Sequence, residues 1–183
     1  SIIYSSSCAI YGDNKFAKES DMMKITSLYA ALKASSEYLI DKYLGNKKIN
    51  LVYARLFNLY GGNDKFSVIS KIVNSLKNSS PFYLINNGNN IRDFIYINDV
   101  AKIYKLIIES GLVGKINISS GNGIKIKKVI KIAEKISRKK LQIINKVKTD
   151  IHTCVGCNEI ITNKLGFKDF TKLEDFFYEE INS

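Results

Sequence analysis

The sequence predicts an α/β fold built on a mainly parallel sheet. Short apolar runs rich in β-branched residues alternate along the chain with amphipathic helical patterns. The run 49–57 is almost continuously apolar, which is typical of a strand covered on both faces of its sheet. With 183 residues, 45% of them hydrophobic, the chain is long enough to bury one core with a small satellite lobe.

The amino-terminal elements follow from local patterns. Leu28, Leu32 and Leu39 recur at helical spacing, and Gly45 ends that pattern. We expect, in order, a strand at 1–6, an irregular polar segment at 12–23, a helix at 25–44, a strand at 49–57 and a loop at 58–63.

The remaining elements alternate in the same way. Asp99, or Asn98 before it, is expected to cap a helix, and Gly166 to follow the end of another. We expect helices at 68–76, 99–110, 126–136, 158–165 and 172–181, strands at 81–85, 94–97, 115–118 and 141–147, and a turn at 120–123.

Charge and cysteine content restrict the class of protein. The net charge of +11 is compatible with nucleic-acid binding, but the lysines are scattered and rarely lie among aromatic residues, so we expect no nucleic-acid partner. No apolar run is long enough to span a bilayer, and the first residues carry no secretory signal, so no membrane association is expected. An odd count of three cysteines favours a reducing, cytoplasmic location.

Tyr29 and Lys33 form the strongest chemical motif. Residues four apart lie on one face of a helix, one turn from each other. A nearby ammonium favours the phenolate form of tyrosine, so such a pair can take a proton from a sugar hydroxyl near neutral pH. A Tyr-x-x-x-Lys spacing alone is common by chance, and without further context an ordinary tyrosine on a helix face with a solvated lysine is the better explanation.

Three further motifs surround this pair. The stretch 4–12 reads Tyr-Ser-Ser-Ser-Cys-Ala-Ile-Tyr-Gly, 55–61 reads Arg-Leu-Phe-Asn-Leu-Tyr-Gly, and 92–100 reads Arg-Asp-Phe-Ile-Tyr-Ile-Asn-Asp-Val. In this order, the motifs resemble the extended short-chain dehydrogenase/reductase family, within it the UDP-glucose 4-epimerase type, over residues 1–176. The resemblance implies a doubly wound Rossmann-type sheet, NAD as cofactor, and a nucleotide-sugar substrate.

The resemblance assigns the catalytic and cofactor-binding residues. Ser7 stands at the catalytic Ser/Thr, which hydrogen-bonds the reacting sugar hydroxyl, and Tyr29 stands at the catalytic base. Lys33 matches the lysine that holds the nicotinamide ribose and tunes the tyrosine. Phe57 matches a residue at the nicotinamide end of the cofactor.

The resemblance also assigns contacts to the sugar nucleotide. Asn58 matches an asparagine on the sugar diphosphate. Ser67 and Val68 match a helix start whose backbone amides meet the diphosphate, as helix starts can. Tyr83 and Ile85 match a short strand that lies along the uracil ring.

Cationic contacts to the diphosphate are only partly retained. Arg92 matches an arginine on the diphosphate, where a forked cation suits phosphate oxygens. The family's later Arg-x-Gly-Asp matches residues 147–150, in which Asp150 is retained but Val147 replaces the arginine. Lys146 or Lys148 could substitute as a point charge, and the sequence does not decide between them.

The family's Gly-x-x-Gly-x-x-Gly turn has no counterpart in these 183 residues. We therefore expect an amino-terminally truncated fragment, inactive by itself, from a parent that is a homodimer. Residues 1–60 with 94–119 would be the carboxyl-terminal half of the Rossmann-type NAD-binding domain. Residues 61–93 with 120–183 would be a small α/β lobe that binds the nucleotide sugar.

The expected function is that of an NAD-dependent nucleotide-sugar 4-epimerase, as in UDP-glucose/UDP-galactose interconversion. Dehydratases that resemble this family carry an Asp-Glu pair after the catalytic Ser/Thr, where this chain has Cys8 and Ala9, so dehydration is disfavoured. A reductase or another enzyme of the same family, and an inactive sugar-nucleotide-binding remnant, remain alternatives. A role in surface polysaccharide synthesis is a family-level expectation only.

The stretch 152–157, His-Thr-Cys-Val-Gly-Cys, contains a Cys-x-x-Cys spacing. Structural zinc needs four ligands, and no fourth ligand is evident, so we predict no metal site. The resemblance places this stretch in a surface segment, and His152 is expected to face solvent.

Overall fold

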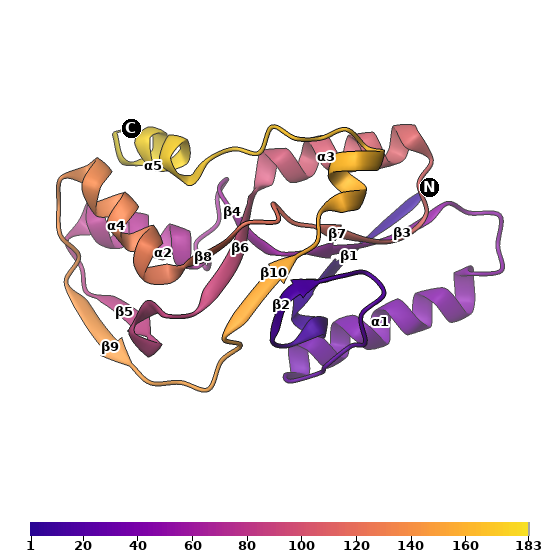
Figure 1. Ribbon diagram of the computed structural model, residues 1–183, viewed down its shortest axis with the longest axis horizontal. Coiled ribbons are helices and arrows are strands. Elements are labelled where there is room, and N and C mark those ends of the chain that lie inside the picture. Colours follow the sequence, from indigo (N-terminus) through magenta and orange to yellow (C-terminus); the bar gives the residue numbers. More distant parts are fainter. Residues whose placement is uncertain (183) are drawn as a thin grey trace.

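The computed structural model describes residues 1–182, and a three-stranded parallel sheet forms one half of it. β1 (Ile2–Ser7), β3 (Leu51–Leu56) and β7 (Gly114–Ile118) lie in the order β1-β3-β7. Helices α1 (Leu28–Leu44) and α3 (Ile97–Ser110) lie on opposite sides of this sheet (Figure 1). The predicted α/β class with a parallel sheet is confirmed.

β3 presents alternate side chains to the two helical layers, because successive residues of a strand point to opposite faces. Val52 and Ala54 belong to a buried cluster that includes Ile103 of α3. On the other face, Arg55 contacts Glu37 of α1. The strand is therefore buried on both sides, as its continuous apolar run predicts.

A second sheet continues across the middle of the molecule. β2 (Asn14–Ala17), β10 (Thr153–Gly156), β6 (Ile91–Tyr96) and β4 (Asn58–Tyr60) lie side by side, and β8 (Gly123–Lys125) pairs antiparallel with β6. The expectations of an irregular segment at 12–23 and a loop at 58–63 are both wrong, because each contains a strand. Both strands are short and are held by partners distant in sequence.

β10 overturns a further expectation. The stretch 152–157 is not a surface segment, because β10 runs between β2 and β6 and is buried along its length. Cys154 and Cys157 are buried and form no disulfide, whereas His152 is exposed as predicted. The apolar character of a four-residue strand that ends in glycine is too weak to reveal this position.

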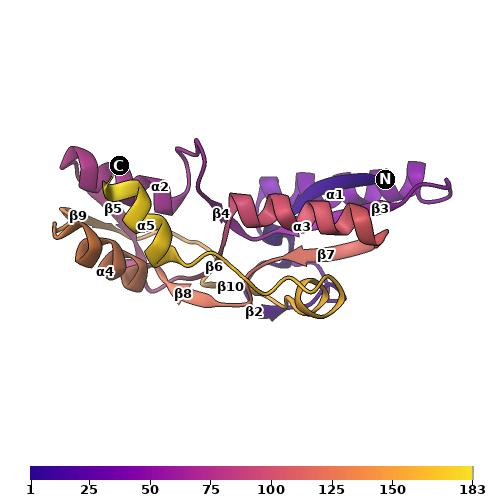
Figure 2. The ribbon, with the colours of Figure 1, turned by 90° about the horizontal axis from the view of Figure 1, so that it is seen from above.

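The other end of the molecule is a separate layered lobe, at the left of Figure 1 and again in the view of Figure 2. It contains α2 (Val68–Asn78), α4 (Ile126–Ser137) and α5 (Leu173–Asn182), with a parallel pair formed by β5 (Phe82–Ile85) and β9 (Ile143–Lys146). The apolar faces of the helices and of β5 share one buried cluster. Predicted positions of these helices and strands agree with the structure to within a few residues.

Three short helical turns complete the chain: η1 (Cys8–Tyr11), η2 (Asn86–Gly88) and η3 (Ile160–Lys164). The predicted cap of α3 is wrong, because the helix begins after Tyr96 without a side-chain cap. Asp99 is buried inside the first turn, where it accepts hydrogen bonds from the amide and the hydroxyl of Thr171. It thus fixes the segment that leads into α5.

Candidate functional site

A cavity of about 460 Å³ opens between α2, β4, β5 and β6. This volume is in the range of small-molecule sites, and the lining is mostly apolar with a few polar groups. Every residue that the sequence analysis assigned to the sugar nucleotide lines it: Asn58, Ser67, Val68, Tyr83, Ile85, Arg92 and Asp150. The fold therefore brings together residues from five separate stretches of the chain.

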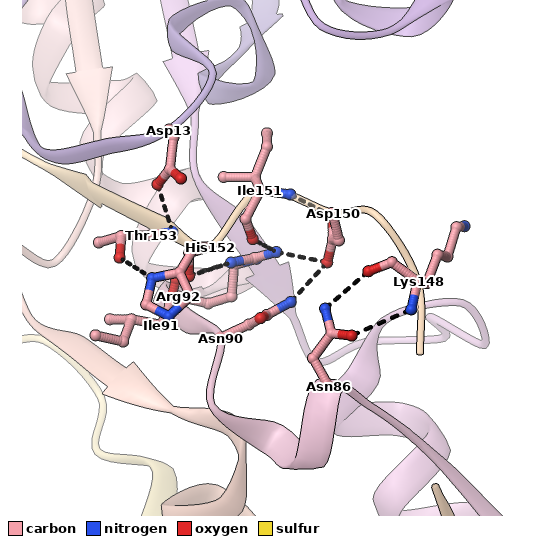
Figure 3. Close-up of polar contacts among 10 residues, drawn as sticks. All are labelled: Asp13, Asn86, Asn90, Ile91, Arg92, Lys148, Asp150, Ile151, His152 and Thr153. Carbon is pink, nitrogen blue, oxygen red and sulfur yellow. Dashed lines mark hydrogen bonds and ion pairs between the residues drawn. The ribbon is translucent and has the colours of Figure 1, made fainter. Parts of the chain in front are cut away.

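Arg92 stands at one wall of this cavity, with its guanidinium bound to the segment that precedes β10 (Figure 3). Nη2 donates to the Asp150 carboxylate at 2.8 Å and to the Ile151 carbonyl at 2.6 Å. Nη1 donates to the carbonyls of Ile91 and His152. A phosphate group would have to compete with these acceptors for the guanidinium.

Residues 147–150 form a strap beside the cavity, and Asn86 holds it in place. The Asn86 amide donates to the Lys148 carbonyl at 2.8 Å, and its oxygen accepts from the Lys148 amide at 3.1 Å (Figure 3). Asn90 donates to the Asp150 carboxylate at 2.9 Å. Val147, at the position of the family arginine, is 98% exposed, so it contributes no contact there.

The start of α2 forms another wall. Ser67 caps the helix by accepting from the Ser70 amide, and the Asp64 carboxylate accepts from the Ser67 amide and the Ser70 hydroxyl. Burial raises the pKa of Asp64, but these hydrogen bonds outweigh it and lower the pKa to about 2. The Ser67 amide is therefore already engaged by an internal carboxylate.

Tyr83 supplies an aromatic wall. Its ring is about half exposed and lines the cavity. The ammonium of Lys146 lies 4.0 Å from the centre of this ring, within cation–π range. In the parallel register of β5 and β9, Ile85 is paired with Lys146, so Lys146 lies close to β5.

Tyr29 and Lys33 occupy the first turns of α1, the end that lies toward the middle of the molecule in Figure 1. The Lys33 ammonium donates to the Ser5 carbonyl at 2.8 Å and lies 5.9 Å from the centre of the Tyr29 ring. Tyr29 is 53% exposed, and its hydroxyl makes no hydrogen bond to any residue among 1–182. Ser7 is buried, and its hydroxyl accepts from the Ala9 amide.

Tyr29 therefore lies beside Lys33 and makes no hydrogen bond to Ser7. Phe57 is buried, and its ring stacks on Tyr11 with 6.4 Å between centres. None of these side chains lines the cavity, whereas Asn58, one residue after Phe57, does. Asn58 also donates to the Asp93 carbonyl at 3.0 Å, which ties β4 to β6.

A buried polar network that was not predicted from the sequence lies beneath α1 and includes Glu37 of this helix. Arg55 makes a two-pronged contact with Glu37, at 3.1 and 2.8 Å, and donates to the Tyr11 hydroxyl. Ser6 donates to Glu37 at 2.5 Å. Two signals could have revealed it: an arginine inside an apolar strand, and a glutamate four residues after Lys33 on the same helix face.

Asp93, next to Arg92 in β6, is fully buried. Its carboxylate accepts from the amides of Ser120, Gly121 and Gly156 and from the Ser120 hydroxyl. Burial outweighs these hydrogen bonds and raises its pKa from 3.8 to about 6. Asp93 thus joins β6, β10 and the turn after β7.

Among residues 1–182, no helix is long and apolar enough to cross a membrane. Within the same residues, no three side chains of metal-binding type lie close enough together to hold an ion.

A family model described as the NAD dependent epimerase/dehydratase family matches residues 1–119. A dTDP-4-dehydro-6-deoxyglucose reductase from Escherichia coli is 30% identical over 189 aligned positions, which cover 95% of this chain and 58% of that protein. A dTDP-D-glucose 4,6-dehydratase from Dictyostelium discoideum is 28% identical, over 56% of this chain and 24% of that protein.

Solved structures are similar over almost the whole chain. A UDP-N-acetylglucosamine 4-epimerase from Methanobrevibacter ruminantium, in complex with UDP-N-acetylmuramic acid, has a TM-score of 0.87 at 29% identity. A UDP-glucuronic acid 4-epimerase from Bacillus cereus, in complex with UDP-glucuronic acid and NAD, has a TM-score of 0.90 at 23% identity. Both matches cover 98% of this chain but only 61% and 60% of the other chains, so this chain spans only part of the length of its relatives.

Proposed function

The chain belongs to the NAD dependent epimerase/dehydratase family, and from that premise we propose that it carries the sugar-nucleotide site and the catalytic side chains of a nucleotide-sugar 4-epimerase. One observation carries the proposal: the residues assigned to the sugar nucleotide line a single cavity of suitable size. Tyr83 and Ile85 would face the uracil ring. Asn58, Arg92, Asp150 and the start of α2 would face the sugar and its diphosphate.

We propose that Tyr29 moves the proton of the sugar hydroxyl. The Lys33 ammonium lies one helical turn away, 5.9 Å from the centre of the Tyr29 ring. The Ser7 hydroxyl, at the end of β1, would hydrogen-bond the same sugar oxygen and keep it in line with Tyr29. Tyr29 would return the proton to this oxygen, and the configuration would invert because hydride, which NAD would supply, would return to the opposite face of the carbon.

NAD, when bound, supplies the hydride acceptor and donor for this chemistry. Lys33 fits the ribose at the nicotinamide end of NAD. Its ammonium donates to one carbonyl, that of Ser5, so its other N–H groups could donate to the ribose hydroxyls. Tyr29 would share that ribose, and Phe57 would lie at the nicotinamide end. A glycine-rich turn for the pyrophosphate is not found in these 183 residues.

The test is activity of a protein that joins this sequence to a glycine-rich NAD-binding segment. Conversion of UDP-glucose to UDP-galactose should fall by at least about 100-fold in Tyr29→Phe, because a general base contributes on that order. Tyr38→Phe is the matched control, since Tyr38 is on the same helix and is exposed on a different face. Full activity of Tyr29→Phe would disprove the assignment of the base.

A reductase is the second candidate, favoured by the alignment of the Escherichia coli reductase with 95% of this chain. Dehydration is disfavoured, because Cys8 is buried and neither it nor Ala9 carries a carboxylate. Product analysis by NMR with UDP-, GDP- and dTDP-sugars separates the two. A sugar of inverted configuration supports the epimerase, a reduced 4-keto sugar supports the reductase, and binding without turnover supports an inactive remnant.

We propose a second copy of the chain as partner. Leu28, Leu32, Leu39 and Tyr43 form an exposed apolar stripe along α1, which another α1 could cover. Light scattering should report a dimer for the wild type and a monomer for Leu32→Glu. A wild-type monomer at high concentration would exclude this pairing.

We also propose that the chain forms two structural units. One consists of residues 1–60 and 94–119, and the other consists of residues 61–93 and 120–183. The separate buried clusters around β3 and around α2 support this division. Buried residues cross this division in both directions, because Ile161 of η3 packs in the cluster of β3, and Tyr60 and Phe94 pack in the cluster of α2.

A further inference from the structure

The cavity has little net charge for an anionic ligand. Arg92 and Asp150 are the only lining residues that carry full charges, and they form an ion pair at 2.8 Å. Their charges cancel to first order. Asp64 adds a carboxylate at the start of α2, where it already occupies the Ser67 amide. A diphosphate in this cavity therefore needs a further cation.

Lys146 is placed to be that cation. Its ammonium lies 4.0 Å from the centre of the Tyr83 ring, and Tyr83 lines the cavity. The stacking holds the charge at the rim without an ion pair, because no carboxylate among residues 1–182 lies within salt-bridge distance of it. A lysine on a flexible stem can move from a ring face to a phosphate oxygen and keep its charge.

The two neighbouring residues are less suitable. Val147 points into solvent and has no charge. Lys148 is fixed through its backbone by Asn86, and Figure 3 shows its side chain directed away from the polar cluster. The structure therefore discriminates between two lysines that the sequence left equivalent.

We propose that Lys146 determines the selectivity of this cavity for nucleoside diphosphates, by binding a phosphate oxygen from its position on the Tyr83 ring. This inference rests on the proposed function, because it takes a sugar nucleotide as the occupant. It selects Lys146, which is not among the residues that line the cavity, from the two lysines that the Arg-x-Gly-Asp comparison left open. Selectivity here means the ratio of the affinities for UDP and for uridine, which differ only in the diphosphate.

The experiment is an NMR titration of the 183-residue chain with UDP and with uridine. Lys146→Met keeps the stem on Tyr83 and removes the charge, so UDP affinity should fall by about tenfold or more, as for loss of a charged hydrogen bond. Uridine affinity should stay within about twofold, since base contacts are unchanged. Lys146→Arg should recover most of the UDP affinity because it restores the cation.

Lys148→Met is the matched control and should bind UDP like the wild type. Equal UDP affinity in Lys146→Met and wild type would overturn the lysine assignment while leaving the proposed function intact. Equal losses for UDP and uridine would also overturn it, because they would indicate damage to the base site. A wild-type chain that does not bind UDP at all would overturn the proposed function and this inference together.

Discussion

Two arginine–carboxylate pairs of the same length occupy opposite halves of the molecule. Arg55 and Glu37 meet at 2.8 Å with side chains 1% and 5% exposed, beneath the helix that carries Tyr29. Arg92 and Asp150 also meet at 2.8 Å, but their side chains are 12% and 40% exposed, beside the cavity. The shortest contact has the same length in both pairs, but Arg55 makes two hydrogen bonds to Glu37 and Arg92 makes one to Asp150. The two pairs also differ in their exposure to solvent.

The buried pair is part of a closed network. Arg55 also donates to Tyr11, whose hydroxyl donates to Asn117 at 2.7 Å, and burial raises the pKa of Tyr11 to about 12. These groups are buried, where hydrogen bonds are stronger than in water, so the network fixes α1 against the sheet. The partly exposed pair of Arg92 and Asp150 holds a strap beside the cavity, where a ligand could replace Asp150 as the partner of Arg92.

The largest effect is expected from breaking the buried pair. Glu37→Ala leaves a buried guanidinium without its carboxylate, so the free energy of unfolding should fall by about 3–5 kcal/mol. Glu37→Gln, which keeps an acceptor for Ser6, should lose less. Urea unfolding followed by circular dichroism measures both, and a loss below about 1 kcal/mol in Glu37→Ala would contradict the role given to this network.

The next effect concerns Asp93, which is also buried but has no cationic partner in hydrogen-bond contact. Its pKa in the folded chain is raised to about 6, so its protonation stabilises the fold fully below about pH 4, and this contribution is lost as pH rises through 6. The unfolding free energy of wild type minus that of Asp93→Asn should therefore fall by on the order of 2–3 kcal/mol between pH 4 and 7.

Urea unfolding at several pH values measures this difference, and other titrating carboxylates cancel because both proteins contain them. A difference that stays constant with pH would mean that the surrounding donors keep Asp93 ionised throughout.

The smallest effect is expected at the exposed pair. Asp150→Ala should lower the unfolding free energy by less than about 1 kcal/mol, because solvent screens this pair and Arg92 keeps three carbonyl acceptors. Differential scanning calorimetry at low and high salt measures the change. A loss as large as that of Glu37→Ala would remove the distinction between the two pairs.

The sequence predicts the regular parts of this fold well. The helix at α2 has clear amphipathic spacing, and the run at β3 is apolar enough to identify a doubly covered strand. The short strands β2 and β4 were missed because they have only four and three residues and depend on distant partners. The local sequence pattern of a strand does not show which distant strand it pairs with.

The candidate site could likewise be predicted only in part. The resemblance identified residues that the fold gathers around one cavity, although no single stretch contains them. It could not predict that Arg92 binds the strap through Asp150, nor that Lys146 stacks on Tyr83. These contacts depend on the register of β5 with β9, which the separate strand patterns do not specify.

The position of β10 has a consequence for the order of folding. The Thr153 amide donates to Asp13, 140 residues earlier, and β10 bridges β2 to β6. During synthesis, the central sheet cannot close until residues 153–156 have left the ribosome, whereas α1 and α2 can form from local contacts beforehand. Pairings of such long range are slow to search, so completion of this sheet is expected to limit the rate at which the chain folds.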